Sequence, residues 1–361
     1  MAVADPTVSR TDGAGRPHAP ATLTGPAQIP WVYWILGFVL LLMPVVASNF
    51  VLFQIFGWAF ILGMIGLSLM FLGGYGGMVS LAQMTVAGIA AYMVAVFGQS
   101  GVLQISLGAP WWVAVPVALV IATAFGTVTG ALAVRTEGIY TIMITLAIAA
   151  AFFYFARQNY ALLNGFNGFN QVLPPELFGV DWRRPVPLYY LTMVFAALAY
   201  FTVLYVARTP FGLALQGVRD NPRRMAALGF NVTAHRIAAY AFASFIAAVA
   251  GILLVWLNAQ VSPGTIAVGP AIDILIIAVI GGLRHPIGPF IGALIFVLLR
   301  TFALDFLVMV GIPGERFQLL VGLVFLAIVF WSPDGILGLW PKVVARMRAA
   351  SSLTGNRDGG V

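Results

Sequence analysis

Long apolar runs separated by short polar or glycine-rich breaks fill most of the chain between residues 31 and 332. A helix needs about 20 apolar residues to cross a bilayer, and most of these runs meet that length. The pattern predicts about ten membrane spans, at residues 31–48, 50–72, 80–99, 110–134, 138–156, 187–207, 234–258, 268–283, 287–309 and 315–332. The predicted fold is therefore all-α, a polytopic transmembrane bundle of eight to ten helices.

Glycine-rich stretches flank the third run, 80–99, and the eighth, 268–283. Each of these two runs is a doubtful span, which could cross the membrane, dip into it without crossing, or be broken midway. Non-helical backbone at membrane depth must be shielded from lipid, so the breaks at 73–77 and 281–288 are expected to line a cavity. Apolar Gly-xxx-Gly spacings, which predict close helix packing, occur at Gly73/Gly77, Gly126/Gly130 and Gly288/Gly292.

Composition supports a membrane protein, since 61% of the 361 residues are apolar and 8% are charged. A soluble domain carries about a quarter charged residues. The first run, 31–48, begins late for a signal peptide and lacks a clear small-residue cleavage site, so it is interpreted as a span. Residues 1–29 are interpreted as a disordered tail, 30–341 as the membrane domain and 342–361 as a second tail.

The distribution of positive charge predicts the orientation of the bundle. With ten spans and a cytoplasmic N-terminus, ten Arg and Lys residues fall inside and five outside, leaving out the distal tails. Lys and Arg concentrate in cytoplasmic loops, so this orientation is favoured and both termini are expected in the cytoplasm. The net charge of +7 therefore reflects membrane topology and does not predict nucleic-acid binding.

Several kinds of chemistry find no support in the sequence. There is no cysteine, and His18, His235 and His285 lack metal-ligand spacing. The single lysine, Lys342, follows no glycine-rich loop, which excludes a P-loop for ATP. No nucleophile motif is visible, so we expect neither an enzyme nor a cofactor or metal bound by this chain.

A basic segment, residues 208–236, separates two of the apolar runs. Asn221 is a suitable N-cap, Pro222 a suitable first helical residue and Gly229 a suitable C-terminal cap, which predicts two short helices with a bend between them. Two interpretations remain open. The segment either lies on lipid headgroups as an ordinary cytoplasmic loop, or docks a partner through Ala214, Ala226 and Ala227 with arginines steering the contact.

The same segment, GLALQGVRDNPRRMAALGFNVTAHRIAAYAFASFIAAVAGIL, resembles the coupling segment of branched-chain amino-acid ABC transporter permeases of the LivM type. The resemblance covers about residues 50–341 and includes GGYGGMVSLAQMTVAGIAAYMVAV, LAVRTEGIYTIMITLA, LLNGFNGF and IGGLRHPIGPFIGAL in the family's order. Ala82, Ala90 and Arg284 stand where the family usually has glycine, Leu163 departs from its loop motif, and Asp273 stands where it commonly has Glu.

The resemblance implies a permease subunit of a multi-pass importer in a bacterial inner membrane. It implies a second related permease, two ATPase subunits that bind ATP and Mg²⁺, and a periplasmic substrate-binding protein as partners. Residues 209–229 would be the cytoplasmic coupling helices, with an ATPase-coupling role for Gly212, Arg219, Asp220, Pro222, Arg223, Arg224, Ala226 and Gly229.

Polar residues inside apolar runs mark a candidate substrate pathway, because polar groups in hydrocarbon usually face a cavity or a partner helix. The candidates are Gln83, Thr85, Thr141, Thr145 and Asp273. Thr141 and Thr145 could instead bond to their own helix carbonyls, and Gln83 could link two helices. The substrate is predicted to be a branched-chain, hydrophobic amino acid. Urea or a short amide is an alternative, as is an ion-coupled carrier or channel of another class.

Overall fold

The computed structural model describes residues 31–309 except Glu137, Leu177, Phe178 and Val180, together with residues 322, 323, 325, 326, 335 and 336. Side chains are described from residue 37 to residue 302 and at those six later positions. Both predicted tails lie outside the described residues. Of the predicted span 315–332, only four residues are described.

Helices form nearly all of the described chain. The α-helices are α1 Trp31–Val46, α2 Trp58–Met70, α3 Gln83–Phe97, α4 Trp111–Ala133, α5 Ile139–Gln158, α6 Tyr160–Leu163, α7 Pro185–Arg208, α8 Pro210–Asp220, α9 Pro222–Ala227, α10 Val232–Asn258, α11 Val268–Gly281 and α12 Gly288–Met309. The π-helical turns Val51–Gly57 and Phe71–Tyr75 extend α2, and short 3₁₀ turns occur at Gly165–Asn167 and Pro263–Ile266. Strands β1 Phe169–Asn170 and β2 Gln260–Val261 pair antiparallel, with Phe169 opposite Val261. The predicted helical class is confirmed.

Helix α1 belongs to a separate unit that ends at Val46, and the rest of the chain forms a second unit. The α1 sequence is apolar throughout and contains Pro44. The helix has 16 residues, slightly fewer than the ~17 that a span usually needs.

Among the described residues of the second unit, five helices are long and apolar enough to cross a membrane, and each corresponds to a predicted span: Val51–Tyr75, Trp111–Ala133, Ile139–Gln158, Pro185–Arg208 and Val232–Asn258. The two doubtful predicted spans are shorter, since α3 has 15 residues and α11 has 14. Neither helix alone reaches the ~17 residues of a typical span. Their glycine-rich flanks account for the shortfall, because glycine is a poor helix former.

Two helices form the centre of the second unit. In Val51–Tyr75 and Val232–Asn258, 83% and 67% of the most apolar window is buried, against 22–33% in the other three long helices. Helix α10 packs on α2, α3 and α4, while α2 also contacts α7, α11 and α12. Helices α4, α5 and α7 therefore present most of their apolar surface outward, as lipid-facing or partner-facing helices do.

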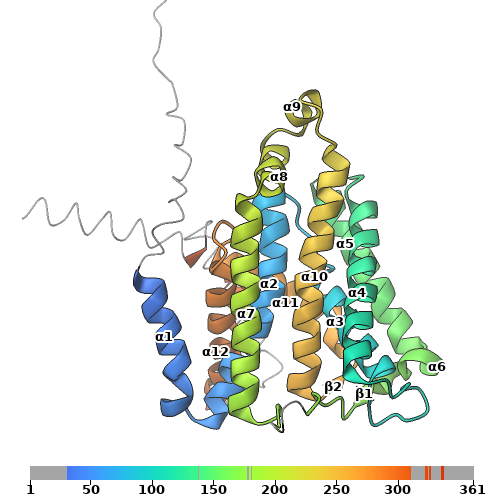
Figure 1. The fold of residues 1–361 in the computed structure, drawn as a ribbon, viewed down its shortest axis with the longest axis vertical. Coiled ribbons are helices and arrows are strands. Elements are labelled where there is room, and N and C mark those ends of the chain that lie inside the picture. The colour runs from blue at the N-terminus through green and yellow to red at the C-terminus, as the bar shows by residue number, and fades with distance from the viewer. Residues whose placement is uncertain are drawn as a thin grey trace, which may run out of the picture. The chain divides into compact units, whose positions relative to one another are not determined.

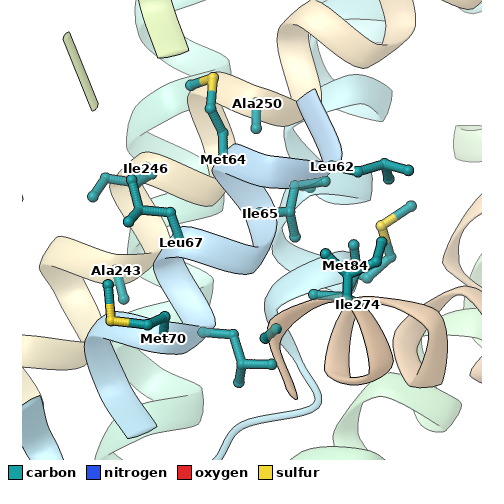
Figure 2. Close-up of a cluster of buried hydrophobic side chains, with 14 of the residues drawn as sticks. Leu62, Met64, Ile65, Leu67, Met70, Met84, Ala243, Ile246, Ala250 and Ile274 are labelled. Atoms are coloured by element: carbon teal, nitrogen blue, oxygen red, sulfur yellow. The ribbon is translucent and has the colours of Figure 1, made fainter. Parts of the chain in front are cut away.

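The contact between α2 and α10 pairs large side chains with small ones. Figure 2 shows Met64, Leu67 and Met70 of α2 beside Ala243 and Ala250 of α10. Small residues let helix backbones approach closely where lipid supplies no hydrophobic driving force. At Gly251 of α10 the approach is extreme, because a Cβ there would lie 1.9 Å from the carbonyl oxygen of Ala87.

The predicted Gly-xxx-Gly contacts are confirmed at two places. A Cβ on Gly126 would lie 2.0 Å from the Ser244 hydroxyl, and one on Gly130 would lie 2.4 Å from Tyr240, so both glycines of α4 face α10. In α12, Gly292 faces the backbone of α11 in the same way. These glycines serve helix packing and do not mark a separate site.

The ends of the second unit differ in structure (Figure 1). Helices α8 and α9 lie at one end, and strands β1 and β2 at the other. Helix α10 connects the two ends, and its 27 residues span about 40 Å at 1.5 Å per residue. We call these the α8–α9 end and the β1–β2 end.

Candidate functional site

The basic segment folds into the two short helices that the sequence predicts. The Thr209 hydroxyl accepts a hydrogen bond from Gly212 N–H at the start of α8. Asn221 Oδ1 accepts one from Arg224 N–H at 2.9 Å, with Pro222 as the first residue of α9. The predicted N-cap is therefore confirmed, and it fixes the bend between α8 and α9.

Helix α9 also has a defined C-terminal end. Gly229 has φ +89°, a left-handed conformation that glycine adopts without steric cost. The N–H of Gly229 bonds to the carbonyl of Ala226, and that of Phe230 bonds to Met225. These bonds satisfy carbonyls that the helix end would otherwise leave without donors, as predicted for a glycine cap.

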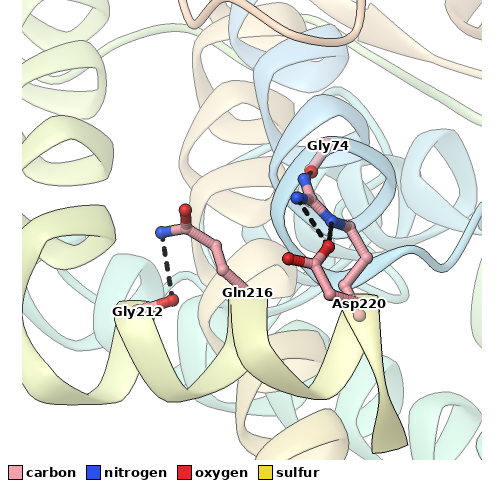
Figure 3. A network of polar contacts seen from close by, with 5 residues as sticks. Gly74, Gly212, Gln216 and Asp220 are labelled. Atoms are coloured by element: carbon pink, nitrogen blue, oxygen red, sulfur yellow. Dashed lines mark hydrogen bonds and ion pairs between the residues drawn. The ribbon is translucent and has the colours of Figure 1, made fainter. Parts of the chain in front are cut away.

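One face of α8 is attached firmly to the bundle. Leu215 and Val218 are fully buried, and Gly212 approaches the Val206 carbonyl so closely that a Cβ would lie 2.2 Å from it. The Gln216 amide donates to the carbonyls of Ala207 and Gly212, the latter bond being drawn in Figure 3. Because α8 is fixed to the end of α7, a displacement of α8 must also move α7.

The predicted partner-facing role of Ala214 is wrong. Its side chain is buried at 7% exposure within the chain's own core, so no partner can reach it. The sequence gives α8 an amphipathic pattern, but the periodicity does not say whether its small apolar face meets the bundle or a partner.

Helix α9 has the opposite character, since none of its residues is buried. Arg223, Arg224 and Ala226 are exposed. Leu228 is 66% exposed and Phe230 40% exposed just beyond it. The helix lies at the tip of the α8–α9 end in Figure 1. It therefore presents arginines and apolar side chains together on an unpartnered surface of the described chain.

Arg219 joins α8 to the glycine-rich break after α2. Its Nε and Nη2 lie 2.9 and 2.8 Å from Asp220 Oδ1, and its Nη1 donates to the Gly74 carbonyl. Figure 3 shows Gly74 and Asp220 on either side of this guanidinium. Gly77, with φ +68°, leaves room for the Arg219 side chain, which a Cβ would meet at 2.7 Å. Arg219 and Asp220 thus make contacts inside the chain.

The same break also touches the loop between α11 and α12. A Cβ on Gly74 would lie 2.2 Å from the Leu283 carbonyl oxygen. This contact places the two glycine-rich breaks, 73–77 and 281–288, against each other. The end of α2, the start of α12 and the end of α8 therefore meet in one cluster.

A non-helical segment, residues 78–82, follows the first break and leads to α3. Its backbone is satisfied from inside the chain, since Leu81 N–H donates to the Thr145 hydroxyl and Ala82 N–H to Ser80. Gln83 accepts a hydrogen bond from Ser68 at 3.2 Å. Ser68 precedes Tyr75, the last residue of the π-helical turn that extends α2, by seven residues. Helix α3 therefore starts about 10 Å from that end, measured along the helix axis.

Four of the five predicted pathway residues are buried at or near α3. Gln83, Thr85, Thr141 and Thr145 are 0–4% exposed. Thr141 donates to the Thr136 carbonyl and Thr145 to that of Ile142. Thr85 differs from the other three in its hydrogen bonding, because its hydroxyl has no partner among the described residues. None of these four side chains lines the cavity that contains Asp273.

Asp273 lies in a cavity of about 260 Å³ next to the β1–β2 end, since Asn258 and Ser262 of its lining flank β2. Polar or charged side chains lining this cavity include Asn258, Thr265 and Arg300, and apolar ones include Leu62, Met84 and Ile274. The guanidinium of Arg300 lies 5.9 Å from the centre of the Trp58 ring, within cation–π range. The structure therefore combines Asp273 with residues from α2, α3, α10 and α12.

The sequence analysis missed Arg300 as a site residue, since it was counted among outer-loop charges. It lies within α12, nine residues before the end of the helix. A lone charge inside an apolar run is the signal that could have found it, because such charges rarely face lipid. In the described part of the chain, no three His, Asp or Glu side chains come together in a metal-binding arrangement.

Apolar helices of membrane-spanning length, with the exposed helix α9 at one end of the bundle, are features of a multi-pass membrane protein. A family described as "Branched-chain amino acid transport system / permease component" matches residues 51–329. The chain therefore belongs to this family of permeases.

Curated relatives carry related names. The high-affinity branched-chain amino acid transport system permease proteins LivM of Salmonella typhimurium and Escherichia coli are each 23% identical over 296 residues, covering 76% of this chain and 65% of the relative. A probable permease protein LivH of Methanocaldococcus jannaschii is 30% identical over 175 residues, covering 45% of this chain and 52% of that protein. The chain thus matches just under two thirds of the LivM relatives' length. No solved structure gives a significant match.

Proposed function

We propose that this chain is the permease subunit of an ABC importer in a bacterial inner membrane, and that it carries branched-chain amino acids. Family membership and the names of the LivM relatives support the transport class and the substrate. The observation that carries the mechanism is α9, a capped helix without a buried residue at the tip of the α8–α9 end.

The surface of α9 suits a protein partner better than lipid headgroups alone. Both ends of the helix are capped, so little conformational entropy remains to be lost when a partner binds. Leu228 and Phe230 supply exposed apolar area, and Arg223 and Arg224 supply charge beside it. This combination fits a groove with acidic residues at its rim, which we assign to an ATPase subunit.

The arginine distribution supports a cytoplasmic position for the α8–α9 end. Within the described chain, the arginines at or near this end are Arg135, Arg208, Arg219, Arg223, Arg224, Arg236 and Arg284. Those toward the β1–β2 end are Arg157, Arg183, Arg184 and Arg300. The excess follows the positive-inside rule and favours a β1–β2 end that faces a periplasmic binding protein.

The proposed complex contains four further subunits. Two ATPases bind ATP and Mg²⁺, because this sequence has no P-loop of its own. A second, related permease completes the membrane path, and the similarity to a LivH protein supports such a pair. A periplasmic protein delivers the substrate.

Force would pass from α9 through α8 into the bundle by two routes. Gly212 and Gln216 fix α8 to the end of α7, and Arg219 fixes it to the end of α2 through Gly74. Transport then requires the ATPase to hold α8 and α9 differently in two states, because only a differential interaction shifts an equilibrium.

Charge reversal on α9 tests the proposal in the assembled transporter. Arg223→Glu with Arg224→Glu is expected to abolish co-purification of the ATPases and lower leucine uptake at least about tenfold. Arg183→Glu with Arg184→Glu is the matched control, since it reverses two adjacent exposed arginines toward the other end. Normal ATPase binding and uptake by the α9 variant would refute the docking role.

A further inference from the structure

Two opposite charges line the cavity toward the β1–β2 end without bonding to each other. Asp273 and Arg300 both face it, yet no ion pair joins them, and Asp273 accepts no hydrogen bond from any side chain or backbone group in the described part of the chain. Charges within apolar spans are costly, so they normally pair with each other or face a ligand. Here Asp273 and Arg300 do not pair with each other, so a ligand can pair with both.

The packing of α11 on α12 gives the depth of each charge. Ile277 of α11 contacts both Gly66 of α2 and Gly292 of α12, which places these three residues at one level. Asp273 lies four residues from Ile277, and Arg300 lies eight residues from Gly292. At 1.5 Å per residue, Arg300 is about 6 Å nearer the β1–β2 end than Asp273. The carboxylate is therefore the deeper of the two charges.

We infer that this cavity binds the zwitterionic head of an amino acid between Asp273 and Arg300. The inference rests on the proposed function and names a site for its substrate. The ammonium group pairs with the Asp273 carboxylate, and the substrate carboxylate pairs with the planar guanidinium of Arg300, which suits bidentate recognition. Leu62, Met84 and Ile274 supply the apolar wall for the aliphatic tail.

The size of the cavity agrees with this ligand. Its volume of about 260 Å³ equals the space of roughly nine water molecules, at about 30 Å³ each. That space is large enough for the heavy atoms of a small aliphatic amino acid. The Arg300 guanidinium lies 5.9 Å from the centre of the Trp58 ring, and both residues line the cavity.

Met84 of α3 is a buried part of the cavity lining. Met84 is 4% exposed and follows Gln83, the residue bonded to Ser68 across α2 and α3. Helix α3 follows the glycine-rich break in which the Gly74 carbonyl accepts a hydrogen bond from Arg219. Movement of α3 would open the next stage of the path.

The absence of cysteine from the natural sequence provides a direct test. Thr265→Cys places one thiol in the cavity lining, and Asp181→Cys places one on an exposed loop at the same end as the control. Each variant, in the assembled transporter, is labelled from outside with a membrane-impermeant maleimide. Leucine in excess is expected to slow labelling at position 265 and not at position 181.

Two analogues show which group is recognised. 4-Methylpentanoate lacks the ammonium group and 3-methylbutylamine lacks the carboxylate, so neither is expected to protect position 265. Equal protection by either analogue, or no protection by leucine, would overturn the zwitterion site. Protection by urea or acetamide in place of leucine would overturn both this site and the proposed substrate.

Substitutions separate failure of the cavity from failure of the proposed function. Asp273→Asn and Arg300→Gln are expected to reduce leucine uptake by about tenfold or more, because each removes one charged hydrogen bond to the substrate. ATPase co-purification should remain normal and reports correct folding. If the unaltered transporter imports leucine and both variants import it equally well, the cavity assignment fails while the proposed function stands. If the unaltered transporter imports no amino acid, the proposed function fails.

Discussion

The Arg219 guanidinium donates a hydrogen bond to the Gly74 carbonyl and so connects residues that lie 145 positions apart in the sequence. Arg219 lies in the last turn of α8, and Gly74 belongs to the π-helical turn that ends the central helix. The bond joins the most exposed element of the described chain, through α8, to its most buried helix. It is one of the two contacts through which α8 is held to the bundle, the other being the end of α7.

Removal of this link should uncouple ATP hydrolysis from transport. Arg219→Ala is expected to lower leucine uptake about tenfold in the assembled transporter, because α8 loses its hydrogen bond to the Gly74 carbonyl after α2. ATPase subunits should still bind, since α9 is unchanged. Uptake and hydrolysis measured together in proteoliposomes test this. Arg184→Ala removes an exposed arginine with its own ion pair to Asp181 and serves as the control.

The cap of α9 predicts a local effect. Asn221→Ala should destabilise α9 by about 1 kcal/mol, because the Arg224 N–H loses its acceptor. Hydrogen exchange at residues 222–230 should become faster, while α10 keeps its protection. Asn221→Ser retains a capping oxygen and should behave almost as the unaltered chain. Unchanged exchange in the alanine variant would contradict the role of the cap.

A third prediction concerns the non-helical segment before α3. Thr145→Val should destabilise the chain by about 1–3 kcal/mol, because the buried Leu81 N–H then lacks an acceptor. Thr145→Ser keeps the hydroxyl and should retain most of the stability. Thermal unfolding in detergent compares the two variants. Equal melting temperatures would show that the segment finds another acceptor.

Helix contact at Gly251 predicts a larger effect. Gly251→Val should cost at least about 1–3 kcal/mol, since its Cβ would overlap the Ala87 carbonyl and force α3 away from α10. The yield of folded protein and its melting temperature measure this loss. Gly37→Ala, at a helical glycine with no atom within 4 Å of a Cβ, is the control and should be tolerated.

The sequence predicts helix caps and close helix contacts correctly where a single residue determines them. The caps at Asn221 and Gly229 and the contacts of Gly126 and Gly130 depend on local chemistry or on the absence of a side chain, and the structure confirms them. The boundaries of the long predicted spans are also recovered, because the length of an apolar run determines them.

Partners across the bundle could not be predicted in this way. Ala214 and Ala226 look alike in sequence, yet one is buried and the other exposed. The contact of Arg219 with Gly74 and the shared cavity of Asp273 and Arg300 join segments whose packing no periodicity specifies. Side-chain periodicity assigns a face to a helix and leaves the identity of its neighbour open.

The central claim is that this chain transports only when separate ATPases act on α8 and α9. Concentrative leucine uptake into proteoliposomes, measured with the assembled transporter and with this chain alone, tests it most directly. The account predicts uptake that requires the ATPases and ATP, with none by the chain alone under a proton or sodium gradient. Uphill transport by the chain alone would contradict it.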